Sequence, residues 1–251
     1  MSEAQIQIKD LEMRYGSLLI QEDLTFNINR GDIFIIMGGS GCGKSTLLKH
    51  LVGLMRPAAG TIHYGKTDFW KSPEHERMAI MKNIGILYQQ GALWSSMTLA
   101  ENIAIPLEEY TDATPADIKD LAEFKLQLVG LAGYGDFYPS EISGGMRKRA
   151  ALARAIALDP EILFFDEPSA GLDPISAKLL DDLILELRDA LGTTVVIVTH
   201  ELDSIFAIGS NSVFLDPETK TMIAEGNPSE LRNHSTDPRV RDFLTRCATK
   251  I

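Results

Sequence analysis

The chain is poor in cysteine and in basic residues for its length of 251. Only Cys42 and Cys247 are present, and Cys42 lies in a glycine-rich stretch where a disulfide would be awkward, so we expect a reducing compartment. No cysteine or histidine pair has metal-ligand spacing, which argues against a structural zinc. The 24 Lys and Arg face 35 Asp and Glu, and the net charge of −11 argues against nucleic acid as a partner.

Long apolar runs are also missing. No stretch approaches the roughly 18–20 residues that span a bilayer, and the opening MSEAQIQIKD has neither the basic nor the apolar region of a leader peptide. We therefore expect the chain to stay in the cytosol. With 45% hydrophobic and 24% charged residues and no biased tract, the composition is that of a globular protein. Its length allows either one compact domain or a domain with a lobe inserted into it.

Short apolar runs are present, and helix-like segments separate them. The run at 33–37 lies between two glycines and suits a buried central strand of a parallel sheet. Similar runs occur at 162–165 and 195–198, with a helix-like segment at 175–190 between them. The order strand, helix, strand, helix predicts an α/β core.

The remaining segments fall before and between these runs. Apolar and polar residues alternate at 6–8 and at 24–28, which predicts two strands near the start of the chain. The middle of the chain, 89–160, has no comparable apolar run and offers helix-compatible stretches at 114–129 and 143–158. We interpret it as a helical lobe inserted into the sheet domain.

The first chemical signal follows the strand predicted at 33–37. The residues there are Gly38, Gly39, Ser40, Gly41, Cys42, Gly43, Lys44 and Ser45, with Thr46 opening the next helix-like stretch. They fit the pattern G-x-x-x-x-G-K-[ST], in which backbone N–H groups and a helix N-terminus surround phosphate oxygens. Lys44 would reach the β and γ phosphates, and the Ser45 hydroxyl would bind Mg²⁺. The alternative is an ordinary glycine turn with an incidental lysine.

A pair of carboxylates closes the run at 162–165. Ligands of open α/β sheets bind at the carboxyl ends of strands, which is where Asp166 and Glu167 stand. Asp166 would hold Mg²⁺, usually through water, and Glu167 would act as the general base on the attacking water. Alone, the pair would be an ordinary strand end; with the phosphate loop present, it predicts the second half of a nucleotide site.

Kinases, GTPases and many ATPases share both features, so a third segment decides among them. Residues 142–147, Ile-Ser-Gly-Gly-Met-Arg, begin a helix-like stretch and resemble the LSGGQ signature of ABC ATPases, with Ile in place of Leu and Met in place of Gln. Ser143, Gly144 and Gly145 would form a second helix-start anion site that faces outward, toward the nucleotide of another subunit. Alone, Ser143 would be a plain helix N-cap.

Four further side chains match positions of the ABC family in order, over a resemblance that covers about residues 5–225. They are Tyr15, Gln89 of the Q-loop, Asp173 of the D-loop and His200. The resemblance implies that Tyr15 would stack on adenine, Gln89 would contact Mg²⁺ or the water, Asp173 would lie at a dimer interface and His200 would contact the γ-phosphate. Without the family, Tyr15 would read equally well as a half-buried core residue, and a lone histidine is more often structural.

The resemblance implies both a fold and a mode of action. The fold is a P-loop NTPase (RecA-like) α/β core with N-terminal antiparallel strands and an inserted helical subdomain. We expect the ATP-binding core in 1–88 and 160–224, the helical signature subdomain in 89–159 and a C-terminal extension in 225–251. The implied activity is hydrolysis of ATP with Mg²⁺ by a dimer of two copies, beneath an integral membrane permease.

Other segments are similar to the ATPase subunits of MCE-associated, Mla-type lipid transporters. They are 33–41, 91–94, 143–146, 150–157 and the ending 237–244. Such subunits drive phospholipid movement between bacterial envelope membranes, so the resemblance implies a place on the cytoplasmic face of the inner membrane and an MCE-domain protein as a further partner. An amino-acid-type ABC importer ATPase and a soluble ABC ATPase of the iron–sulfur assembly type stay as alternatives. A DNA-repair type would carry a long heptad insertion, and a translation factor would carry two cassettes.

Two apolar segments have two interpretations each. After the Q-loop come Leu93, Trp94, Met97 and Leu99, which are either core or a groove that receives the permease. Near the C-terminus, Phe243 and Leu244 stand among arginines and either anchor the second copy of a dimer or cap their own domain.

Overall fold

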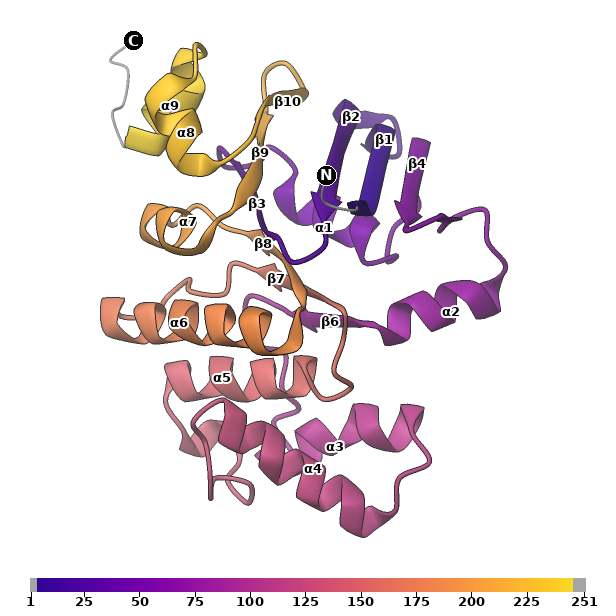
Figure 1. The fold of residues 1–251 in the computed structure, drawn as a ribbon, viewed down its shortest axis with the longest axis vertical. Coiled ribbons are helices and arrows are strands. Elements are labelled where there is room, and N and C mark those ends of the chain that lie inside the picture. The colour runs from indigo at the N-terminus through magenta and orange to yellow at the C-terminus, as the bar shows by residue number, and fades with distance from the viewer. Residues whose placement is uncertain (1–3, 246–251) are drawn as a thin grey trace. The chain divides into compact units, whose positions relative to one another are not determined.

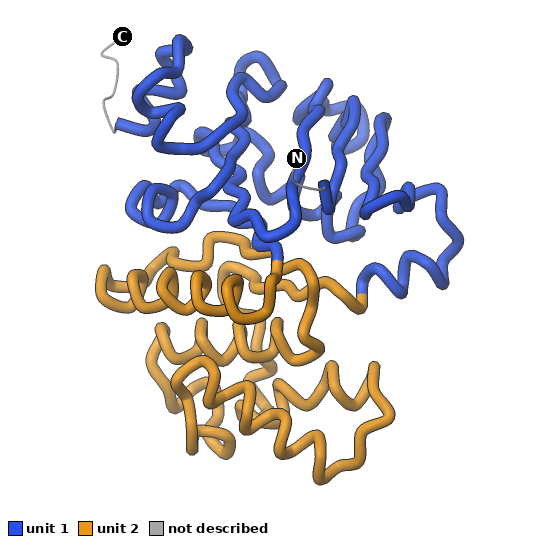
Figure 2. The backbone as a smooth tube through the Cα atoms, viewed as in Figure 1, with its two compact units in different colours: residues 1–81, 194–251 blue, residues 82–193 orange. Residues whose placement is uncertain are grey.

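The computed structural model describes residues 4–245, so Cys247 lies outside the described residues. The chain divides into two compact units (Figure 2). Unit 1 consists of residues 1–81 and 194–251, and unit 2 of residues 82–193. The division of the sequence at 88, 159 and 224 stays a prediction. The α/β class is confirmed, because strands and helices of both units alternate along the chain (Figure 1).

The first sheet of unit 1 is antiparallel and confirms the two strands expected near the start of the chain. Its members are β1 (Ala4–Tyr15), β2 (Leu18–Asn29), β4 (Ala59–Tyr64) and β5 (Thr67–Asp68), in the order β2-β1-β4-β5. Ile6 stands opposite Ile28 and Ile8 opposite Phe26, and all four side chains are buried. The alternation seen in the sequence therefore marks the face that this sheet buries.

The second sheet of unit 1 is built on the strand expected at 33–37. In chain order its members are β3 (Ile33–Gly38), β8 (Thr194–Val198), β9 (Asn211–Asp216) and β10 (Thr221–Glu225). β3 runs parallel to both β8 and β9, and β10 is antiparallel to β9. All residues of β3 and β8 are buried, which explains why both read as continuous apolar runs.

The helices of unit 1 lie between and after these strands along the chain. They are α1 (Lys44–Leu51), α2 (Glu74–Lys82, whose last residue belongs to unit 2), α7 (Leu202–Ile208), α8 (Pro228–His234) and α9 (Pro238–Thr245). α9 packs on its own unit: Val240 and Leu244 are buried, and the ring of Phe243 meets that of Phe214 edge-on at 5.1 Å. α9 thus caps its own domain, and its role as an anchor for the second copy of a dimer stays a prediction.

Unit 2 pairs two parallel strands and adds most of its helices between them. The strands are β6 (Ile84–Leu87) and β7 (Ile162–Asp166). The helices are α3 (Leu99–Tyr110), α4 (Pro115–Leu128), the short 3-10 helix η1 (Pro139–Glu141), α5 (Gly144–Ala155) and α6 (Pro174–Leu191). The helices expected at 114–129, 143–158 and 175–190 are thus confirmed, with α5 ending three residues early.

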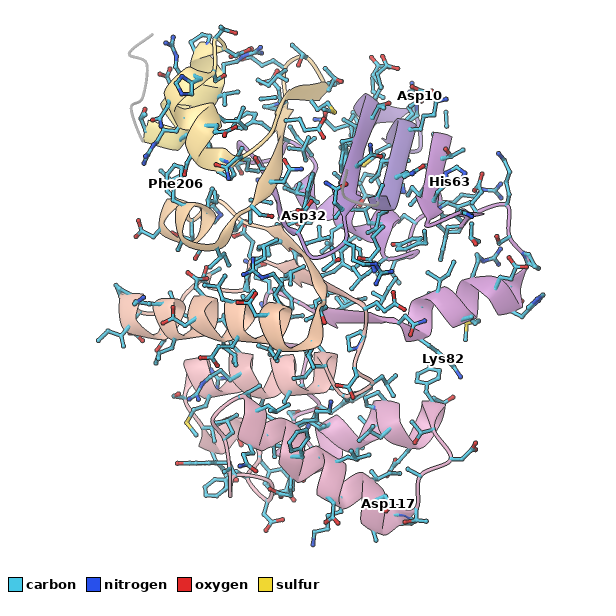
Figure 3. All side chains as sticks on the ribbon, in the orientation of Figure 1. Asp10, Asp32, His63, Lys82, Asp117 and Phe206 are labelled. Carbon is cyan, nitrogen blue, oxygen red and sulfur yellow. The ribbon has the colours of Figure 1, made fainter. Side chains whose placement is uncertain are left out.

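Local contacts fix the helices of unit 2 in place. α4 begins in a capping box, in which the Thr114 hydroxyl accepts from the Asp117 N–H and the Asp117 carboxylate accepts from the Thr114 N–H. Asp117 lies in the first turn of this helix (Figure 3). The buried Lys125 of α4 pairs with Asp159 at 2.5 Å, in the loop before β7. No helix within residues 4–245 is both long and apolar enough to cross a membrane.

Candidate nucleotide site

The phosphate loop lies between β3 and α1, as expected from its motif. Gly43 is the N-cap of α1 with φ of 99°, a left-handed conformation that favours glycine, and a Cβ there would lie 2.7 Å from Ile20 Cγ2. The ammonium of Lys44 donates to the carbonyls of Gly38 and Gly39 at 2.9 and 3.0 Å. α1 has no acidic residue in its first turn, so its positive end stays available to an anion.

A buried glutamine donates a hydrogen bond to the backbone of this loop. Gln21 of β2 is fully buried, and its amide nitrogen donates to the carbonyl of Cys42 at 2.7 Å and to that of Asp216 at 2.9 Å. Cys42 itself is buried, and this burial raises the pKa of its thiol, with the Lys44 charge acting in the opposite direction. The thiol therefore fills space in the loop and is not a reactive nucleophile.

The two other expected residues of unit 1 lie at the ends of strands. β3 and β8 are parallel, and Ile36 stands opposite Val198. Gly38 and His200 each come two residues after this pair, so both lie at the carboxyl-end edge of the sheet. His200 is exposed, and its Nε2 lies 3.6 Å from Glu201. Tyr15 ends β1 and is 46% exposed, which fits a ring free to stack on a base better than a core residue.

Unit 2 brings the Q-loop and the carboxylate pair to one edge in the same way. In the parallel pair of β6 and β7, Leu87 stands opposite Phe165, so Gln89 and Glu167 are each two residues past this pair. Asp166 ends β7, and Glu167 has φ of 49°, an uncommon left-handed conformation for a residue with a side chain. Strain of this kind is concentrated at functional sites.

A lysine that sequence reasoning missed connects these two residues. Lys148 of α5 is 8% exposed, and its ammonium donates to the carbonyl of Gln89 and, at 3.3 Å, to that of Glu167. Burial lowers the pKa of Lys148, and the nearby carboxylates of Glu167 and Asp166 oppose this shift.

The signature and D-loop residues stand at the starts of two helices. Ser143 is the N-cap of α5, its hydroxyl accepts from the Met146 N–H at 3.2 Å, and its side chain is exposed. Asp173 is the N-cap of α6 and accepts from the Ile175 and Ser176 N–H groups. The hydrogen bond from the Ser176 hydroxyl lowers the pKa of Asp173 most.

The segment after the Q-loop presents its aromatic side chain to solvent. Trp94 is 61% exposed while Leu99 is buried, so the stretch divides between surface and core. The buried Asn102 fixes it, because its side chain accepts from the Trp94 N–H and donates to the carbonyls of Trp94, Met97 and Thr98. Arg154 of α5 adds hydrogen bonds to the carbonyls of Gly91 and Ala92.

The described residues contain no group of three or more His, Cys, Asp and Glu side chains that could hold a metal ion. The expected Mg²⁺ ligands, Ser45, Gln89 and Asp166, are a hydroxyl, an amide and a carboxylate. Oxygen donors of these types suit Mg²⁺, which keeps several waters and is bound by few protein groups together with substrate phosphates.

Comparison with known proteins gives the class of the chain. A phosphate loop after a buried parallel strand, with carboxylates ending a second strand, defines a P-loop nucleotide-binding fold. The family model of the ABC transporter matches residues 21–170, more than half of the chain, and the chain belongs to this family. It is an ATPase subunit of an ABC transporter.

Two groups of relatives are similar over nearly the whole chain. The "Probable ribonucleotide transport ATP-binding protein mkl" of Mycobacterium leprae is 42% identical over 95% of this chain and 68% of its own length. The "Intermembrane phospholipid transport system ATP-binding protein MlaF" is 38% identical in Haemophilus influenzae, over 97% of this chain and 91% of the relative. MlaF of Escherichia coli K12 is also 38% identical, over 95% and 88%.

Solved structures show the same fold. CbiO1 from Clostridium perfringens, part of the ABC transporter complex cbiONQ, is 26% identical with a TM-score of 0.83 and covers 97% of both chains. The ATP-binding cassette MJ0796, in a dimeric post-hydrolysis state bound to ADP and Pi, is 26% identical with a TM-score of 0.79 over 88% of this chain and 98% of that one. The fold class expected from the sequence is confirmed.

Proposed function

We propose that this ATPase energises phospholipid transport across the bacterial envelope through a separate permease. The observation that carries the cargo assignment is the similarity to MlaF along 97% of this chain and 91% of the relative. The mycobacterial relative is slightly more similar, but this chain spans only 68% of it. The place of action in this proposal is the cytoplasmic face of the inner membrane, with an MCE-domain protein as a further partner.

The proposed site assigns one task to each group. Tyr15 stacks on adenine, and the loop from Gly38 to Thr46 binds the phosphates through backbone N–H groups and Lys44. Glu167 takes a proton from the attacking water, Gln89 orients that water, and His200 contacts the γ-phosphate. Mg²⁺, held by Ser45, Gln89 and Asp166, would neutralise charge on the β and γ phosphates.

The proposed working form is a dimer of two copies. Ser143, Gly144 and Gly145 begin a helix whose N–H groups form an anion site, and Ser143 is exposed. In the proposal, this turn completes the nucleotide site of the second copy. ATP then favours the closed dimer because it contacts both copies there, and hydrolysis removes that preference.

The catalytic assignment is tested by two substitutions in the complex with its membrane partner. We expect Lys44→Ala to weaken ATP binding, since it removes the cation of the phosphate loop. Glu167→Gln should leave binding intact and slow hydrolysis roughly 10²- to 10⁴-fold, the usual contribution of a general base. A steady-state ATPase rate of Glu167→Gln within threefold of wild type would remove Glu167 from this role.

The cargo is tested in a deletion strain. Loss of the protein should weaken the outer lipid barrier, seen as sensitivity to detergent or chelator, because phospholipid movement between the membranes would stop. The wild-type chain should restore the barrier and Glu167→Gln should not. A strain with a normal barrier and defective uptake of an amino acid or a ribonucleotide would contradict the lipid assignment and leave the ATPase assignment in place.

A further inference from the structure

The ammonium of Lys148 lies in an unusual place for a lysine. The residue is only 8% exposed, and its ammonium donates to two backbone carbonyls, those of Gln89 and Glu167, with the carboxylates of Glu167 and Asp166 nearby. Burying an ammonium is unfavourable unless hydrogen bonds replace its water, and a methionine of similar length would fill the same space without that cost. The location of these two carbonyls suggests why a lysine stands here.

Each carbonyl belongs to a residue of the proposed hydrolysis step. β6 and β7 are neighbouring strands (Figure 1). Gln89 follows β6 and Glu167 follows β7, so the Lys148 side chain connects the ends of the two strands. The Glu167 backbone has φ of 49°, which is unfavourable for a residue with a Cβ and must be held by its surroundings. The hydrogen bond from Lys148 to its carbonyl is one such restraint on the orientation of the carboxylate.

Lys148 also belongs to the helix that carries the signature. α5 starts at Gly144, directly after its N-cap Ser143, and Lys148 stands one turn later on the same side as Gly144. A short helix moves as a rigid body, so a shift of the signature turn displaces the ammonium as well. Arg154 of the same helix binds the carbonyls of Gly91 and Ala92, which fixes the following part of the Q-loop to α5.

We propose that Lys148 is a positioning residue that holds the Q-loop and the general base at a fixed separation and thereby links the signature helix to the carboxylate of its own copy. This inference rests on the proposed function, because it takes Gln89 and Glu167 as members of the hydrolysis site. Lys148 acts through backbone carbonyls and does not itself contact the nucleotide in this proposal.

A positioning role and a purely structural role differ in what they change. In the proposal, Tyr15 and the loop at 38–46 bind ATP, whereas the hydrogen bonds of Lys148 go to the carbonyls of Gln89 and Glu167. Misplacing Glu167 and Gln89 should therefore lower kcat and leave KM nearly unchanged. Arginine keeps a charge and several donors and should partly restore the rate, whereas a residue needed only to fill space would be replaced best by methionine.

The experiment measures kcat, KM and melting temperature for Lys148→Met, Lys148→Arg and Glu167→Gln in the complex with the membrane partner. The matched control is Lys125→Met, which removes another buried ammonium of unit 2, one paired with Asp159. We expect Lys148→Met to lower kcat about tenfold or more, a part of the general-base contribution, with KM within threefold of wild type. Lys148→Arg should be faster than Lys148→Met, and Lys125→Met should keep kcat within twofold.

Three results would overturn the inference. They are a kcat of Lys148→Met within twofold of wild type, a rise in KM at unchanged kcat, and an arginine variant no faster than the methionine variant. If Lys148→Met does not give a folded complex, Lys148→Gln, which keeps one amide donor, replaces it; failure of both to fold would make Lys148 a structural residue. If Glu167→Gln hydrolyses ATP at the wild-type rate, the assignment of Glu167 as the general base, on which this inference rests, is wrong instead.

Discussion

Buried polar side chains of this protein donate hydrogen bonds to backbone carbonyls outside their own helix or strand. Gln21 binds the carbonyls of Cys42 and Asp216, and Lys148 binds those of Gln89 and Glu167. Asn102 does the same for the segment that carries Trp94. Each of these hydrogen bonds fixes a segment outside the element that carries the side chain. They add to backbone hydrogen bonds, such as those from the Ala170 N–H to the Glu167 carbonyl and from the Met97 N–H to the Trp94 carbonyl.

His50 gives a pH-dependent prediction at the residue scale. It is 1% exposed in the last turn of α1, with Nδ1 2.8 Å from the Met55 carbonyl and no hydrogen-bond partner at Nε2 within the described part of the chain. Burial lowers the pKa of His50 below its ordinary 6.5. As pH falls through 6.5, the unfolded chain binds a proton before the folded one does, so this residue destabilises the fold progressively.

We therefore expect the melting temperature to fall more between pH 7.5 and 5.5 in wild type than in His50→Gln. About 1 kcal/mol corresponds to roughly 2–4 °C in a chain of this size, so an effect of a few degrees is measurable by calorimetry. His75→Gln, at an exposed position of α2, is the control and should keep the wild-type slope. Parallel curves for wild type and His50→Gln would show that His50 does not titrate in this way.

The sequence alone predicts the parts of the candidate site that are made of neighbouring residues. It does not predict the buried side chains that hold these parts in place. The phosphate loop and the signature are each built from neighbouring residues, because both use successive backbone N–H groups, so their spacing is visible in the sequence. Lys148 meets a carbonyl 59 residues away and Gln21 one 195 residues away. No local pattern distinguishes such a lysine or glutamine from one on the surface.

At the scale of elements, the strands that could be predicted are those buried on both faces or on one regular face. β3 and β8 are entirely buried and read as apolar runs, whereas β10 has no buried residue and gave no signal. α2 likewise buries none of its side chains and has no apolar stripe. Elements without an apolar pattern depend on contacts with residues far away in the sequence. The pairing of β4 with β1 is an example of such a contact.

The loop after the Q-loop gives the prediction at this scale. Asn102 and Arg154 fix its backbone, so Trp94 is a rigidly presented aromatic side chain that is 61% exposed. Such a residue is suited to anchor a partner, because little freedom is lost when it is covered. We expect Trp94→Ala to reduce copurification with the permease, or transport, while the melting temperature changes little.

The control for this prediction is Leu191→Ala. Leu191 ends α6 and is 42% exposed, so the substitution removes an apolar side chain of similar exposure from another element. It should leave the yield of the complex unchanged. A large loss of melting temperature in Trp94→Ala at an unchanged yield of complex would mean that Trp94 supports the fold and not the partner.

At the scale of the whole molecule, the proposed site residues are divided between the two units. Unit 1 contains Tyr15, the phosphate loop and His200, and unit 2 contains Gln89, the carboxylate pair and the signature. The signature turn is the part that the proposal assigns to the second copy, and Ser143 is exposed in the single chain. The chain alone would then bind ATP but lack a complete site for hydrolysis.

If the signature turn completes the site of the second copy, a bulky side chain there should block hydrolysis and leave ATP binding intact. Ser143→Arg adds a long side chain at the start of α5 while the phosphate loop of the same copy stays intact, so ATP affinity should remain within about threefold and hydrolysis should fall at least 10²-fold, as for loss of a donor to developing charge. Ser140→Arg, at an exposed position of the 3-10 helix three residues earlier, is the matched control and should keep most activity. ATP-dependent crosslinking of Ser143→Cys in one copy to Ser40→Cys in the other is the direct measurement. Failure to crosslink with ATP bound, together with an active Ser143→Arg complex, would contradict the shared site.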